Sequence, residues 1–216
     1  MNPLVTCLCL THNRREWLPR AIAHYLNQTY ENRELLIVAS GDDVSGIVMA
    51  RKIWSIRLLG VDGTVGEKRN RGCEAACGDT IAVWDDDDYS APGRLADQMA
   101  RLQATGRAVT GYRALKFTDG KRWWRYNGHP GFAAGTSLCF RREWWRTHRF
   151  EDKQVGQDEE FAAVAARARE LAVAEDLDLM YATIHAGNTS PRRIGGGCWQ
   201  ELPGFVWPEV EEGIRC

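Results

Sequence analysis

In the first half of this 216-residue chain, short apolar runs alternate with segments of helical periodicity. The apolar runs span residues 4–10, 34–39, 55–59 and 80–84, and the helical segments span 15–28, 46–54, 66–77 and 92–105. Strands that are apolar along their whole length are typical of parallel sheets covered by helices on both faces. We therefore predict an α/β fold with a mainly parallel central sheet flanked by helices.

The second half of the chain has a different pattern. It predicts a hairpin over 108–127 with a turn at 118–120, a strand over 135–140, an alanine-rich helix over 155–174 and a strand over 177–185. Gly195 begins a tail with three consecutive glycines and two tryptophans. Since no repeat or long linker interrupts the sequence, we expect a single domain over 1–194 and a short C-terminal extension over 195–216.

Composition excludes several classes of protein. The chain is 44% hydrophobic with a net charge of −1, so overall charge gives no preference for polyanions or membranes. No run approaches the roughly 18 apolar residues of a membrane helix, so we expect no integral membrane segment. The N-terminus lacks the basic start and the cleavage site of a signal peptide. The seven cysteines form no CxxC pair. We expect buried free thiols and a cytoplasmic location, with a metal or disulfide role as the alternative.

Polar clusters follow three of the predicted strands directly, at residues 11–14, 40–43 and 85–88. The carboxyl ends of parallel strands lie at one edge of a sheet, where ligands bind in folds of this class. We therefore expect the three clusters to lie close together although they are far apart in sequence.

The third cluster consists of four consecutive aspartates after an apolar strand. Crowded carboxylates are costly unless a cation compensates them, and oxygen-only ligand sets suit Mg²⁺ or Mn²⁺. In an extended segment Asp85 and Asp87 would face one side, toward a metal, and Asp86 and Asp88 the other. The alternative is a solvated acidic loop.

A basic segment precedes this strand. Lys68, Arg69 and Arg71 follow Gly66 near the start of a predicted helix, where backbone amides and cations favour phosphate. A nucleoside diphosphate would suit both this segment and a metal held by the aspartates. The alternative is a surface basic patch.

Three blocks of sequence, at residues 5–38, 66–95 and 155–161, resemble the family 2 glycosyltransferases of GT-A fold, and the resemblance extends over about residues 3–190. It implies a nucleotide-sugar donor, with a UDP-sugar favoured, and Mn²⁺ or Mg²⁺ as cofactor. It also implies transfer with inversion to an acceptor hydroxyl, with Asp158 as the catalytic base. Asp85, Asp87 and His185 are the implied metal site. The implied donor-binding residues are Thr11, Asn13, Arg14, Ser40, Asp42, Lys68, Arg69, Asn70, Asp85 and Asp86.

The sequence departs from the family pattern at two places. Ala39 and Ser40 stand where the family commonly has an aspartate pair that contacts the base and ribose, and Gln157 stands where a glutamate is usual. A structural histidine is the alternative for His185, and a helix cap or surface acid for Asp158. Two functions of other classes remain as alternatives: a nucleotidyltransferase, and a non-catalytic module that binds sugar nucleotides or glycans.

The acceptor is the least constrained part of the prediction. Two segments, 121–126 and 141–146, combine tryptophan with arginine in the half of the chain where the family builds its acceptor site. Tryptophan stacks on sugars and on nucleobases, and arginine binds phosphate. These segments therefore favour a glycan or polyanionic acceptor, with nucleic acid included, unless the tryptophans belong to the core and the arginines only cover it.

Overall fold

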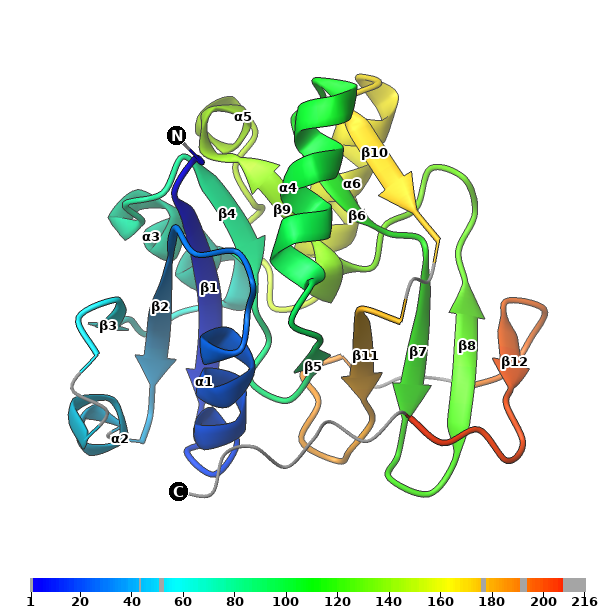
Figure 1. Ribbon diagram of the computed structural model, residues 1–216, viewed down its shortest axis with the longest axis horizontal. Helices are drawn as coiled ribbons and strands as arrows, with labels where there is room; N and C mark the ends of the chain where they lie inside the picture. Colours follow the sequence, from blue (N-terminus) through cyan, green and yellow to red (C-terminus); the bar gives the residue numbers. More distant parts are fainter. Residues whose placement is uncertain (1, 43, 51–52, 176–177, 191–193, 208–216) are drawn as a thin grey trace.

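The computed structural model describes residues 2–42, 44–50, 53–175, 178–190 and 194–207 and contains two sheets (Figure 1). The larger sheet has seven strands in the order β10-β6-β9-β4-β1-β2-β3. They are β1 (Val5–His12), β2 (Arg33–Ser40), β3 (Ile56–Gly60), β4 (Thr80–Val83), β6 (Val109–Tyr112), β9 (Cys139–Arg141) and β10 (Leu171–Ala174). β1 pairs in parallel with β2 and β4, β2 with β3, and β6 with β10, whereas β9 is antiparallel to β4 and β6. The mainly parallel central sheet is therefore confirmed.

The smaller sheet lies beside the carboxyl edge of the larger one (Figure 1). Its strand order is β12-β8-β7-β11-β5, from β5 (Tyr89–Ser90), β7 (Ala114–Thr118), β8 (Trp123–Asn127), β11 (Met180–Thr183) and β12 (Trp199–Glu201). β7 and β8 form an antiparallel hairpin, and β12 adds to the outer edge of β8. The tail that begins at Gly195 thus contributes a strand to this sheet.

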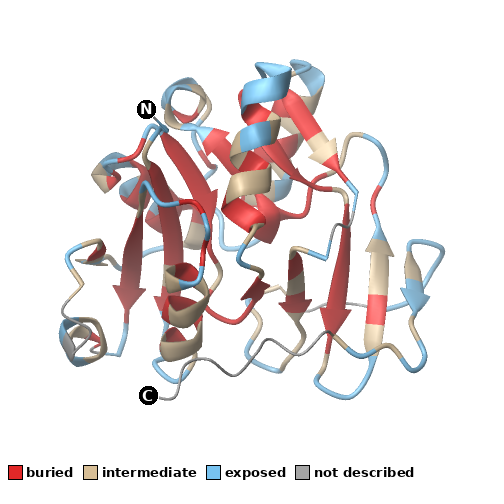
Figure 2. Cartoon of the chain, viewed as in Figure 1, coloured by how far each residue is buried: buried red, intermediate tan, exposed pale blue. Residues whose placement is uncertain are grey.

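Helices cover both faces of the larger sheet. They are α1 (Leu18–Leu26), α2 (Ser45–Ala50), α3 (Val65–Ala75), α4 (Arg94–Thr105), α5 (Arg142–Thr147) and α6 (Gln157–Arg167), with a 3₁₀ helix η1 (Gly135–Ser137). Leucines of α1 and α4 pack on the face formed by Val5, Cys7 and Ile37. α3, α5 and α6 cover the opposite face, and burial is concentrated in the strands between these layers (Figure 2).

Gly72 interrupts the apolar face of α3 because a side chain at this position would collide with the sheet. A Cβ atom at this position would lie 2.3 Å from Leu8 Cδ1 on the sheet, a distance that van der Waals contacts do not allow. The glycine therefore lets α3 pack directly against β1, which outweighs its cost of about 1 kcal/mol in a helix interior.

Several predicted boundaries are wrong. The helix expected over 155–174 ends at Arg167, Arg169 has a φ of 60°, and residues 171–174 form β10 beside β6. The first residues of the expected hairpin belong to β6, so the hairpin begins at Ala114. The strand expected over 135–140 divides into η1 and β9, and α5, β5 and β12 were not expected.

The cysteines agree in part with the expectation of buried free thiols. Cys7, Cys9, Cys73 and Cys139 are buried, and the six cysteines in the described part of the chain are all free. Cys77 and Cys198 are exposed, and Cys216 lies outside the described residues. In the described part, no helix combines the length and the apolar character needed to cross a membrane.

Glu34 joins three elements at the amino edge of the larger sheet. Its Oε1 accepts hydrogen bonds from Thr6 Oγ1 at 2.6 Å and from the Cys77 amide at 2.7 Å, and its Oε2 accepts one from Arg57 at 3.1 Å. Burial alone would raise the pKa of Glu34, but these donors outweigh it and lower the pKa. The charged form therefore stabilises the fold above the unfolded pKa of roughly 4.3, and this contribution is lost as pH falls through the folded value.

We predict that Glu34→Gln lowers the free energy of unfolding by about 1–3 kcal/mol at pH 7, because hydrogen bonds to a buried charge are lost. The difference from wild type should shrink as pH falls below 5. Urea unfolding at a series of pH values measures it, with the exposed Glu31→Gln as the control. A deficit that is the same at pH 7 and pH 4 would contradict this explanation.

Candidate active site

The three polar clusters meet at the carboxyl edge of the larger sheet, as predicted. Arg14, after β1, donates to Asp86 Oδ1 at 3.2 Å and to Asp87 Oδ2 at 2.7 Å, after β4. Asn13 has a φ of 52°, and its Oδ1 accepts a hydrogen bond from the Asp42 amide at 3.0 Å, after β2. The loops that follow three parallel strands are therefore linked by direct side-chain contacts.

Asp85, Asp87 and Asp88 form a cluster that could hold a metal. One oxygen from each lies within 4.8 Å of the other two. The chain turns at Asp86 and Asp87 instead of remaining extended. The expectation that Asp88 faces away from Asp85 and Asp87 is therefore wrong, and Asp88 belongs to the cluster. Three carboxylates form a ligand set that fits Mn²⁺ or Mg²⁺.

Burial and repulsion between neighbours raise the pKa values of Asp85, Asp86 and Asp88. Burial, followed by the charges of its neighbours Asp87 and Asp85, raises the pKa of Asp88 well above its usual value. Burial also raises the pKa of Asp85, with Asp87 adding to the effect and Arg69 opposing it. The pKa of Asp86 rises to about 7, mainly through burial and then through Asp87. A cation beside them would relieve this repulsion.

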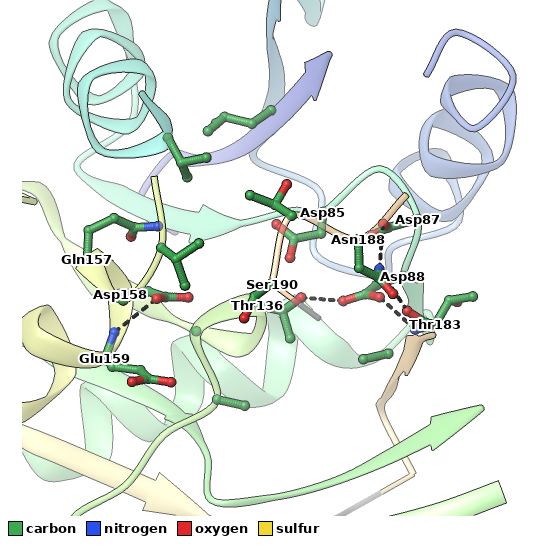
Figure 3. Close-up of a pocket in the computed structure, with 18 of the residues that line it drawn as sticks. Asp85, Asp87, Asp88, Thr136, Gln157, Asp158, Glu159, Thr183, Asn188 and Ser190 are labelled. Carbon is green, nitrogen blue, oxygen red and sulfur yellow. Dashed lines mark hydrogen bonds between the residues drawn. The ribbon is translucent and has the colours of Figure 1, made fainter. Parts of the chain in front are cut away.

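Asp88 is held from two other elements. Its Oδ2 accepts a hydrogen bond from Thr136 Oγ1 in η1, and its Oδ1 accepts one from the Thr183 amide of β11 at 2.9 Å (Figure 3). Neither Thr136 nor Thr183 was predicted from the sequence to contact the aspartates.

His185 contacts Asp87 but lies outside the carboxylate cluster. Its Nε2 is 2.9 Å from Asp87 Oδ2, and its ring stacks on Trp17 with centroids 4.8 Å apart. Asn188 Nδ2 donates to the same oxygen at 3.3 Å. The segment after β11 is therefore fixed beside the aspartates. His185 contacts one member of the cluster, Asp87, and is not itself part of the group that could hold a metal.

Asp158 lies across a cavity of about 450 Å³ from the aspartates (Figure 3). It stands in the first turn of α6, after Gly156 with a φ of 83°. Its Oδ2 is 3.5 Å from Arg69 Nη1 of α3. A Cβ atom at Gly135 would lie 1.7 Å from Asp158 Oδ2, so the carboxylate fills the space beside that glycine. The cavity brings together the expected base and two of the three expected metal ligands, Asp85 and Asp87.

A third wall of the cavity is aromatic and was not predicted. It consists of Phe117, Tyr126, Phe132 and Trp199. The rings of Phe117 and Tyr126 both meet that of Trp199 edge-on, with centroids 4.9 Å and 5.1 Å apart. Strands β7, β8 and β12 thus present an apolar surface opposite the carboxylates.

The remaining expected donor residues lie near a second hollow of about 290 Å³, which Ser40, Asp42 and Asp62 help to line. Buried Lys68 donates to Ser40 Oγ at 2.6 Å, and burial lowers its pKa. Thr11 is buried at the end of β1, between this hollow and the aspartates.

Asn70 is the exception among the expected donor residues. Its amide donates to Phe150 O at 2.9 Å, and its Oδ1 accepts from Trp145 Nε1 at 2.9 Å. Like Thr11, Asn13 and Lys68, it is not among the described residues that line either cavity, but its side-chain contacts point away from both. Its contacts attach α3 to α5, and they give no support to a role in donor binding.

Parts of this chain are similar in sequence to two known proteins. A stretch of 111 residues, 50% of this chain, is 33% identical to the succinoglycan biosynthesis protein ExoO of Rhizobium meliloti, over 32% of that protein. A stretch of 103 residues, 45% of this chain, is 30% identical to an uncharacterized glycosyltransferase of Haemophilus influenzae, over 41% of it. The matches thus span less than half the length of these relatives.

Solved structures share the fold at low identity. Residues 1–349 of TarS from S. aureus in complex with UDP-GlcNAc superpose with a TM-score of 0.72 at 18% identity, over 86% of this chain and 60% of that one. The mannosyltransferase PcManGT from Pyrobaculum calidifontis, in complex with GDP-Man and Mn²⁺, gives a TM-score of 0.65 at 18% identity, over 85% and 57%. Both confirm the GT-A type of fold.

The family model described as glycosyl transferase family 2 matches residues 7–174. The match begins in β1 and ends with β10, so it includes the aspartates after β4, Arg69 and Asp158. It therefore extends over most of the chain, and the chain belongs to glycosyl transferase family 2.

Proposed function

We propose that the protein transfers a sugar from a nucleoside-diphosphate sugar, with a UDP-sugar favoured, to a hydroxyl of a glycan acceptor. The observation that carries this proposal is that one cavity holds the Asp85, Asp87 and Asp88 cluster on one side and Asp158 on the other. A donor diphosphate beside the aspartates would place its sugar in the space between them and Asp158. The structures of TarS with UDP-GlcNAc and of PcManGT with GDP-Man and Mn²⁺ support the choice of donor class.

Asp158 acts as the base in this proposal. It takes the proton of the acceptor hydroxyl, whose oxygen attacks the anomeric carbon on the face away from the leaving diphosphate, so the configuration inverts. Arg69, 3.5 Å from the carboxylate, holds it in place. Arg14 lies beside the position of the diphosphate and would stabilise its charge. A divalent cation bound by Asp85, Asp87 and Asp88 supplies further electrostatic stabilisation of the leaving group.

The cavity favours a neutral glycan over a polyanion as acceptor. Of the described residues that line it, six are acidic and only Arg14 and Arg69 are basic. Its aromatic wall is suited to stack on the apolar face of a sugar ring.

The two basic and aromatic segments give the polyanion little support. Of the described residues in segments 121–126 and 141–146, Tyr126 alone lines the cavity. Trp145 of α5 is buried in the core, and Arg142 donates to the carbonyl of Ala76 at the end of α3. These side chains support the fold, which is the alternative that the sequence left open.

We predict that Mn²⁺ with the correct nucleoside diphosphate raises Tm by about 5–10 °C at a hundredfold excess over Kd, which corresponds to about 2.7 kcal/mol. Differential scanning calorimetry with UDP, GDP, CDP and ADP identifies the base. Asp87→Asn should abolish the shift and the exposed Asp79→Asn should keep it. The absence of a shift with all four nucleotides would contradict the proposed donor.

We predict that Asp158→Asn lowers kcat by about 10²–10⁴-fold, because the base is lost. The shift in Tm with Mn²⁺ and nucleotide should remain, since Asp158 is across the cavity from the aspartates. Release of nucleoside diphosphate measures turnover, and Glu160→Gln, further along α6, is the control. Near-normal turnover of Asp158→Asn would exclude it as the base, and release of pyrophosphate by the wild type would indicate a nucleotidyltransferase.

We predict that Trp199→Ala raises KM for the glycan acceptor about tenfold or more, since stacking contributes roughly 1 kcal/mol beyond the burial of the ring. The KM for the donor should not change. With wild type, kcat/KM for the acceptor should be nearly constant between 50 and 200 mM salt. A steep fall over this range would instead indicate a polyanionic acceptor.

A further inference from the structure

Three donors converge on one oxygen of Asp87. Arg14 Nη1 lies 2.7 Å from Oδ2, His185 Nε2 lies 2.9 Å from it, and Asn188 Nδ2 lies 3.3 Å from it. A carboxylate oxygen has two lone pairs, so three donors leave none of them for another ligand. Arg14 also contacts Asp86 Oδ1 at 3.2 Å, which places one guanidinium between two aspartates of the run.

This ion pair opposes a divalent cation in two ways. The guanidinium occupies one oxygen, Oδ2 of Asp87, in the Asp85, Asp87 and Asp88 cluster, and it places a positive charge beside the position that a cation would take. Like charges held a few ångströms apart in a buried site repel strongly. A cation that binds this cluster must therefore displace Arg14 from Asp87 or bind more weakly because of the repulsion.

A donor diphosphate offers Arg14 another partner. Arg14 lines the cavity, its side chain is 18% exposed, and it stands on the loop after β1. Arg69, the other basic residue on the cavity wall in the described part of the chain, is held differently. It contacts Gln157 and Asp158, and its guanidinium lies 5.4 Å from the centre of the Phe150 ring. Arg14 is thus the better placed of the two to change partners.

We propose that Arg14 couples the binding of donor and metal. It holds Asp87 and weakens the binding of a divalent cation alone, and it moves to the diphosphate when a donor binds, which makes Asp87 available. Donor and metal then bind cooperatively, and each raises the affinity of the other by the same factor. This inference rests on the proposed function, since it takes the donor to be a nucleoside-diphosphate sugar.

The same movement affects the segment after β11. Arg14 Nη2 donates to the carbonyl of Gly187 and lies 3.4 Å from Thr189 Oγ1. If Arg14 leaves Asp87 for the diphosphate, residues 187–189 lose these partners or move with them. Hydrogen exchange of this segment therefore reports on Arg14 independently of metal affinity.

The test measures Mn²⁺ affinity by isothermal titration calorimetry, with and without saturating UDP, and with the binding of Mn²⁺ to UDP in solution subtracted. The variant is Arg14→Met, which keeps the length of the side chain but not its charge, and Arg14→Gln is a second variant. The control is Arg15→Met, because Arg15 is adjacent and exposed. Thermal melting checks that each variant is folded.

We predict that Arg14→Met binds Mn²⁺ alone about tenfold more tightly than wild type, and that UDP increases its Mn²⁺ affinity by a smaller factor than in wild type. It should bind UDP alone more weakly, and Arg15→Met should match wild type. In wild type, UDP should change hydrogen exchange at residues 187–189.

Two results would contradict the inference in distinguishable ways. If wild type binds Mn²⁺ with UDP but Arg14→Met binds Mn²⁺ alone no more tightly than wild type, the coupling role of Arg14 is wrong and the proposed function stands. If wild type binds no Mn²⁺ with or without UDP or the other nucleoside diphosphates, the metal-dependent function fails and the inference fails with it.

Discussion

Four consecutive carboxylates at the end of a buried strand are the feature on which the rest of this site depends. Asp86, Asp87 and Asp88 are each less than a tenth exposed. Burying a carboxylate without partners is costly, so the fold must bring donors and positive charge to this point. Thr136, the Thr183 amide and Arg14 are such donors, and they come from η1, β11 and the loop after β1.

A buried arginine, Arg94, adds further hydrogen bonds around the run of aspartates. Arg94, fully buried at the start of α4, donates to the carbonyls of Val83 and Thr136 and to Ser90 Oγ. Val83 lies two residues before the first aspartate, Ser90 lies two residues after the last, and Thr136 lies on η1, which also donates to Asp88. Arg94 therefore fixes both ends of the acidic run and one of its donors, and loss of this residue would affect the site without direct contact with a ligand.

The sequence predicted those parts of the molecule that depend on periodicity and on strand ends. Alternation of apolar runs with helices was sufficient to predict parallel strands, and the polar residues that follow such strands had to meet at one edge. The prediction failed where tertiary contacts override local propensity. Residues 171–174 are as compatible with a helix as with a strand, and the unpaired edge of β6 decides between them. Asn70 shares a motif with Lys68 and Arg69, but its position on α3 turns it toward Phe150. The facing of Asp88 depends on a turn that an acidic run does not reveal.

The wall that carries the aspartates and the aromatic wall of the cavity come from different parts of the chain. The four consecutive aspartates, Arg14 and Lys68 all lie between residues 11 and 88. The aspartates and Arg14 follow parallel strands of the larger sheet, and Lys68 lies on α3. The aromatic wall comes from the smaller sheet, and Trp199 lies beyond residues 7–174, the part that matches the family model. β12 holds this tryptophan by pairing with β8, so the segment after residue 194 forms part of the cavity even though it follows the expected domain. Under the proposed function, changes in this segment would alter the acceptor side of the cavity without changing the loops that hold the aspartates.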